Sequence, residues 1–73
     1  MNERIVLDPL IHHGKPVIKG TRVPVATIIG NLAGGMSRRD VAREYDIQIS
    51  DIEAALSYAA ELIEGERAIA LVK

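Results

Sequence analysis

The glycine pair Gly34-Gly35 constrains the fold most, because it ends an apolar helical pattern near the middle of the chain. The pattern opens after Pro24, a residue that suits the first position of a helix. Its apolar residues recur at the spacing i, i+3, i+4 and i+7 and form one stripe: Val25, Ile28, Ile29 and Leu32. Thr27 and Asn31 fall on the polar side. The sequence therefore predicts a short helix that begins at Pro24 and stops at the glycines.

Two serines indicate where two further helices begin. Ser37 suits an N-cap, with Asp40 at the third helical position. Ser50 followed by Glu53 has the spacing of a capping box. The apolar residues after each serine keep helical spacing: Val41, Ala42 and Tyr45 in one segment, and Ile52, Ala55, Leu56, Ala59, Ala60 and Ile63 in the other. With the helix before them, these two segments are typical of a helix-turn-helix arrangement.

The connection between the second and third helices is short and apolar. Within residues 46–49, Ile47 and Ile49 are expected to fill the core. Gly65 is expected to end the third helix. The apolar run at residues 68–72 leaves three alternatives open: a further helical turn, an added strand, or a segment that docks on another chain.

The N-terminal third favours a small β ribbon. Residues 5–7 form one short β-prone run, and Val17-Ile18 forms a second. "IHHG" between them reads as a loop, while Gly20 suits a positive φ and Thr21 can bond locally to the backbone. Because an isolated two-stranded ribbon is weak, it must pack on helices or pair with another copy.

Together these elements predict a single, mainly α domain: a helix-turn-helix core of three to four helices with a short N-terminal β ribbon. Residues 1–23 supply the ribbon and loop, residues 24–64 the helical core, and residues 65–73 a C-terminal segment. The chain of 73 residues has no Cys, Phe or Trp, so its core must be small and aliphatic. We therefore expect a homodimer, with the ribbon or the C-terminal segment as the seam. No apolar run approaches transmembrane length and no signal sequence is evident, which favours a cytoplasmic location.

Charge is divided unevenly along the chain. Residues 1–43 carry a net charge of +4 and residues 44–73 a net charge of −5. This split fits a polyanionic partner such as duplex DNA, or ordinary solvated faces. The candidate DNA-binding residues are Lys15, Lys19, Arg22, Arg38, Arg39 and Arg43. Arg22 has a structural alternative, a tie from the ribbon to the core. The outward residues at the start of the third helix include Asp51, Glu53 and Glu61, which disfavours the ordinary insertion of that helix into DNA.

Catalytic and metal-binding patterns are weak. The glycines and lysines of residues 14–20 do not have the order of a phosphate-binding P-loop. His12-His13 has no partner at a ligand spacing, and no serine has a placed base. We therefore expect neither an enzyme, nor a cofactor, nor a metal site.

A series of short motifs resembles one known family. These are Asp8-Pro9, then residues 14–18 (GKPVI), 20–25 (GTRVPV), 35–37 (GMS) and 51–56 (DIEAAL). With them, residues 4 to about 61 resemble the domain of unknown function family 433, whose members are small and winged-helix-like. The family usually has a proline and a leucine-threonine pair between the second and third helices, where this chain has residues 46–50, DIQIS. Ser50 can cap as threonine does.

The resemblance implies a function. Such proteins resemble antitoxins of toxin–antitoxin pairs, which bind a PIN-type ribonuclease toxin and, as dimers, their own operator DNA. Candidate partner-binding residues are Tyr58, Ile69, Leu71 and Val72. Two other interpretations stay open: a stand-alone DNA-binding transcriptional regulator, and a structural or assembly module without nucleic-acid binding.

Overall fold

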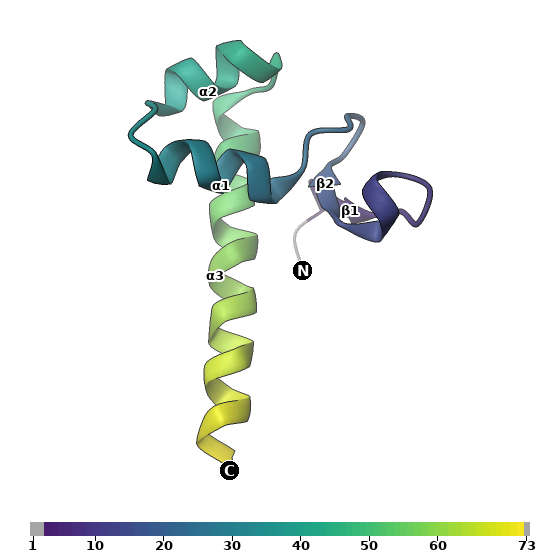
Figure 1. Cartoon of the computed structure of the whole chain (residues 1–73), viewed down its shortest axis with the longest axis vertical. Coiled ribbons are helices and arrows are strands. Elements are labelled where there is room, and N and C mark those ends of the chain that lie inside the picture. Colours follow the sequence, from purple (N-terminus) through teal and green to yellow (C-terminus); the bar gives the residue numbers. More distant parts are fainter. Residues whose placement is uncertain (1–2, 73) are drawn as a thin grey trace.

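A ribbon and three helices make up the fold (Figure 1). The computed structural model describes the backbone of residues 3–72 and the side chains of residues 3–65. The elements run in the order β1 (Ile5–Leu7), a 3₁₀ turn (His12–Gly14), β2 (Pro16–Ile18), α1 (Val25–Ala33), α2 (Arg38–Tyr45) and α3 (Ile49–Val72). The mainly α prediction with an N-terminal ribbon is therefore confirmed.

The core is aliphatic, and every strand and helix contributes to it. Its largest fully buried side chains are Val17 and Ile18 from β2, Ile28 from α1, Val41 from α2 and Ile52 from α3. Ile5 of β1 joins the same cluster. Because these side chains come from all five elements, the small core fixes how the elements are arranged.

The end of α1 follows the glycine prediction closely. Gly35 has a φ of +102°, and its N–H donates to the carbonyl of Leu32 at 3.0 Å. The next N–H, of Met36, reaches back to the carbonyl of Asn31 at 3.0 Å, which completes a Schellman motif. The Asn31 side chain is not on a free polar face, however. Its Nδ2 donates to the Tyr45 hydroxyl at 2.7 Å and ties α1 to α2.

The start of α3 differs from the capping box that the sequence predicts. The Ser37 cap of α2 is confirmed, since its Oγ accepts from the Asp40 N–H at 3.0 Å. In α3, by contrast, the helix begins at Ile49, and the Asp51 carboxylate accepts from the Gln48 N–H at 3.0 Å. The capping contact therefore lies two residues before the predicted one. Asp46 takes a left-handed conformation, φ +54°, directly after α2. The connection between α2 and α3 therefore comprises residues 46–48 and is one residue shorter than expected.

This earlier start also changes which of the two connection isoleucines fills the core. Ile47 packs against the core, as expected. Ile49 lies in the first turn of α3 and is 43% exposed, so the prediction that it fills the core is wrong.

A β-bridge joins the ribbon to the start of α1. β1 pairs antiparallel with β2, with Ile5 opposite Ile18, and Val17 forms a further bridge to Pro24. Pro24 consequently stays extended and is the N-cap of α1 instead of its first residue. The predicted turn at residues 20–21 is confirmed: Gly20 has a φ of +81°, and the Thr21 hydroxyl donates to the carbonyl of Ile18 at 2.8 Å.

Helix α3 continues well beyond the rest of the fold. In Figure 1, α1 and α2 cross its N-terminal half, and no other described element lies beside its C-terminal part. We call residues 61–72 of α3 the arm. Of the alternatives open for residues 68–72, helix is the one observed. The arm makes the chain extended. The radius of gyration of the chain is 13.0 Å, whereas a compact chain of this length has a radius of gyration of about 11 Å.

The prediction that Gly65 ends the third helix is wrong. Gly65 lies within α3 and is absent from the positive-φ positions of the described residues. A single glycine in a helix costs only about 1 kcal/mol relative to alanine, so it does not by itself stop one. The glycine that does stop a helix, Gly35, combines a left-handed φ with backbone bonds back to the preceding turn.

Two alanine substitutions separate these roles. Gly35→Ala should lower the free energy of unfolding by about 1 kcal/mol, because a side chain is strained at positive φ. Gly65→Ala should increase the helical circular dichroism signal and not lower stability, because Gly65 is helical. Urea unfolding followed by circular dichroism measures both. A loss of helicity in Gly65→Ala would contradict the continuous α3.

Candidate functional site

An open apolar groove lies between α1, α3 and the start of β2. It has a volume of about 420 Å³. Its lining includes Pro16, Val25, Ile29, Tyr58 and Leu62, and Lys15 is the only charged residue among the described ones that line it. α1 places Val25 and Ile29 there because they are four residues apart and share a face, as do Tyr58 and Leu62 on α3. Such a surface is suited to bind apolar side chains.

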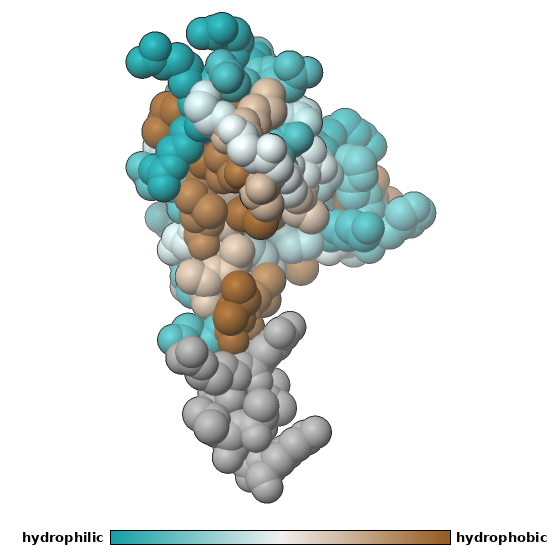
Figure 2. Space-filling view, turned by 60° about the vertical axis from the view of Figure 1, so that its left-hand side comes forward, coloured by the Kyte–Doolittle hydropathy of each residue, from teal (hydrophilic) through white to brown (hydrophobic). Residues whose placement is uncertain are grey.

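The arm begins with two exposed aliphatic residues. Leu62 is 52% and Ile63 64% exposed, although both continue the apolar spacing of α3. Ile63 keeps the helical spacing of the apolar residues that the sequence analysis lists, yet it is exposed because α3 has passed beyond α1 and α2 at that point. Figure 2 shows an apolar band that runs down the helical body onto α3, while the end of the molecule around α2 is hydrophilic.

The predicted partner-binding residues fall at two places. Tyr58 is half-buried, packs against the core and lines the groove. Ile69, Leu71 and Val72 lie on the helical backbone of the arm, but their side chains are outside the described residues.

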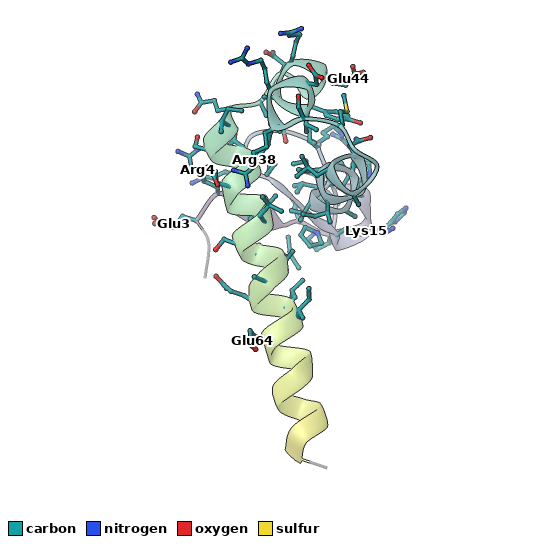
Figure 3. All side chains as sticks on the ribbon, turned by 90° about the vertical axis from the view of Figure 1, so that its left-hand side faces the viewer. Glu3, Arg4, Lys15, Arg38, Glu44 and Glu64 are labelled. Carbon is teal, nitrogen blue, oxygen red and sulfur yellow. The ribbon has the colours of Figure 1, made fainter. Side chains whose placement is uncertain are left out.

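Two arginines lie against the first turns of α3. Arg4 Nη1 contacts Asp51 Oδ1 at 2.8 Å, and Arg38 Nη1 contacts Glu53 Oε2 at 3.2 Å. Figure 3 shows Arg4 and Arg38 close together on this side of the molecule and Lys15 on the opposite side. The two carboxylates therefore neutralise these arginines. Lys15 and Arg38, two of the candidate DNA-binding residues, therefore do not lie side by side.

The other predicted DNA-binding residues have no carboxylate partner within the described part of the chain. They are all exposed: Lys15, Lys19, Arg22, Arg39 and Arg43. Arg22 makes no tie to a carboxylate or carbonyl of the described residues, so the structural alternative for it is not observed. Arg39 and Arg43 are four residues apart on α2 and share a face. A role of these residues in DNA binding stays a prediction.

The ribbon loop has an unusual backbone. His12, His13 and Gly14 have φ values of +49°, +57° and +84°, which make a left-handed turn. Both histidines are exposed. Among the described residues, no three His, Asp or Glu side chains lie close enough to ligate one metal ion. None of the described helices combines the length and the apolar character needed to span a membrane.

Sequence reasoning misses three residues that shape these surfaces. Arg4 and Asp51 join the ribbon to α3, yet they lie 47 positions apart in sequence and no local pattern connects them. Ala26 lines the groove, but a single alanine on the exposed side of α1 has no distinctive sequence signal. The Asp51 cap has a weak signal: an acidic residue three positions after Gln48.

Comparisons with known proteins agree with this fold. Residues 5–59 match the model of the family described as "Protein of unknown function (DUF433)". The chain belongs to the DUF433 family. The uncharacterised protein Rv2308 of Mycobacterium tuberculosis is 35% identical over 54 residues, which are 74% of this chain and 23% of that protein. The crystal structure of Rv2018 from the same organism superposes with a TM-score of 0.66 at 36% identity, covering 71% of this chain and 24% of that one.

This DUF433 chain thus spans about a quarter of the length of each of these relatives. The family match ends at residue 59, just before the arm begins. The matched region contains the ribbon, α1, α2 and the part of α3 that packs on them.

The two ion pairs at the start of the DUF433 α3 helix contribute unequally to the free energy of unfolding. Asp51 both caps α3 and binds Arg4, and its side chain is only 14% exposed. Asp51→Ala should therefore lower the free energy of unfolding by about 1–2 kcal/mol. Glu53→Ala removes only an exposed pair and should change it by less than about 0.5 kcal/mol. Equal effects of the two substitutions in urea unfolding would contradict this assignment.

Proposed function

We propose that this chain is an antitoxin-type protein that binds and masks a partner protein through the arm. The partner class that the family resemblance implies is a ribonuclease toxin of the PIN type. Catalysis forms no part of this proposal.

The exposure of the apolar side chains at the start of the arm is the observation that carries the proposal. The body of the fold already has a closed core, and the arm adds nothing to the described core residues. A helix of this length is marginal in water without tertiary contacts. Ile63 at its start is an exposed apolar side chain that a partner would remove from water, while Leu62 lines the groove.

This arrangement fits a common mode of protein recognition. An amphipathic helix binds by laying its apolar face into a groove of the partner, with anchors three or four residues apart. In sequence, the arm offers aliphatic residues over three turns after Leu62. A helix bound across the mouth of a nuclease site would exclude the RNA sterically.

A charged substitution on the arm tests the proposal. Ile63→Glu places a charge where the partner would bury an aliphatic side chain, and should lower the yield of copurified adjacent-gene product at least tenfold. Ser57→Glu is the matched control, because Ser57 is exposed on α3 before the arm. We expect it to retain the wild-type yield. Equal yields from both variants, or no copurification with the wild-type chain, would contradict toxin binding through the arm.

DNA binding is the second candidate function, and the exposed arginines of α2 favour it. Arg39 and Arg43 have no carboxylate partner among the described residues and present two cations on one helical face. They would contact phosphates, while the pairing of Arg4 and Arg38 removes the repulsion otherwise expected from Asp51 and Glu53.

Salt dependence tests the DNA candidate. The chain should bind duplex DNA from its own upstream region with an affinity that falls steeply with salt. The double change of Arg39 and Arg43 to alanine should weaken binding and lower the salt slope by about two. No duplex binding at low salt would leave the alternative of an assembly module without nucleic-acid binding.

A further inference from the structure

The proposed function leaves the groove between α1 and α3 without an occupant. It is about 420 Å³ in volume and open to solvent. Apart from Lys15, its lining is apolar or small: besides Pro16, Val25 and Ile29 it includes Ala26 and Gly30. An apolar hollow of this size next to exposed leucine and isoleucine is a place where association would remove considerable apolar surface from water.

We propose that the groove takes the α3 helix of a second copy of this chain, in an antiparallel pair around a two-fold axis near Leu62. In such a pair the same patch of both copies forms the interface. Each copy then inserts side chains of its α3 into the groove of the other copy.

The shape of the groove supports a helix as the occupant. Tyr58 and Leu62 form a ridge along one wall, since they are four residues apart on α3. Opposite them, α1 presents Ala26 and Gly30, whose small size lets a helix approach closely. Gly30 has no neighbouring atom within 4 Å of the position a Cβ would take, so the space above it is open.

The charges at the groove indicate that the helix that occupies it belongs to a second copy of this protein. Among the described residues, Lys15 is the only charged one that lines the groove, and it has no ion pair with any of them. Glu61 directly precedes Leu62, is exposed, and likewise has no ion pair there. Charged residues that flank an apolar seam between helices pair across it and set the orientation. A second copy that inserts Leu62 therefore brings Glu61 towards Lys15, and the symmetry makes this contact twice.

The size of the core gives a further reason for a second copy. Nine hydrophobic residues of the described part are buried, and a chain this short buries only about 60% of its unfolded surface on its own. An antiparallel pair would place part of each arm beside the body of the other copy. Ile63 lies about 100° around the helix from Leu62, so it stays available to another protein.

The oligomeric state of the chain alone tests this proposal. Sedimentation equilibrium of the full chain at micromolar concentration should give twice the monomer mass of 7.9 kDa. Ala26→Glu puts a charge into the groove and should give the monomer mass. Because Ala26 is in the first turn of α1, an acidic residue there favours the helix, so the circular dichroism spectrum should not change. Ser57→Glu, on the exposed face of α3, should remain a dimer.

A charge exchange tests the pairing itself. Lys15→Glu and Glu61→Lys should each raise the dimer dissociation constant about tenfold, since like charges then meet twice across the interface. The double variant should return to within about threefold of wild type. A double variant as weak as the single ones would overturn the antiparallel arrangement.

Two other results would overturn the second copy as the occupant. One is a monomeric wild-type chain at concentrations up to about 1 mM, and the other is an Ala26→Glu variant that dimerises like wild type. If the wild type is monomeric and Ala26→Glu loses a copurifying protein, the groove belongs to that protein. These experiments use the chain alone, and Ile63→Glu should leave the dimer intact, so a failure here is distinct from a failure of toxin binding.

Discussion

The packing of aliphatic side chains around Ile52 holds the fold together. Ile52 lies in the first turn of α3 and is fully buried, together with Ile18, Ile28 and Val41 from the other elements. With no Phe or Trp in the chain, aliphatic residues fill the buried cluster, and the two tyrosines pack against it. Truncating Ile52 would leave a cavity in the cluster that α1, α2, α3 and the ribbon share, and would lower the free energy of unfolding by about 2–5 kcal/mol.

This arrangement uses only the first half of α3. The helix supports α1, α2 and the ribbon up to about Tyr58, and then continues without a neighbour among the described elements. Two apolar surfaces remain: the groove beside Tyr58 and the arm beyond it. Both surfaces lie where the body meets the arm, outside the core. We therefore assign them to binding another molecule and not to the stability of a single copy.

The sequence predicts most of the body because its signals are local. The stop at Gly35, the cap at Ser37 and the apolar stripe of α1 each depend on residues within a few positions. All three are found in the structure.

The start of α3 and its length could not be predicted in the same way. Asp51 and Ser50 both suit a cap, and the choice of Asp51 goes with its contact to Arg4, a residue distant in sequence. Gly65 is a stop signal only when its φ is positive, which a sequence does not reveal. The groove arises from residues of three elements and has no linear pattern.

Amide hydrogen exchange along α3 tests the central claim, that the body folds by itself and the arm is stabilised by association. In a dilute sample of monomer, amides of residues 52–59 should exchange at least about a thousandfold more slowly than those of the arm. At concentrations where copies associate, or with a bound partner, the arm should become protected as well. Equal protection along all of α3 in the monomer would contradict the account.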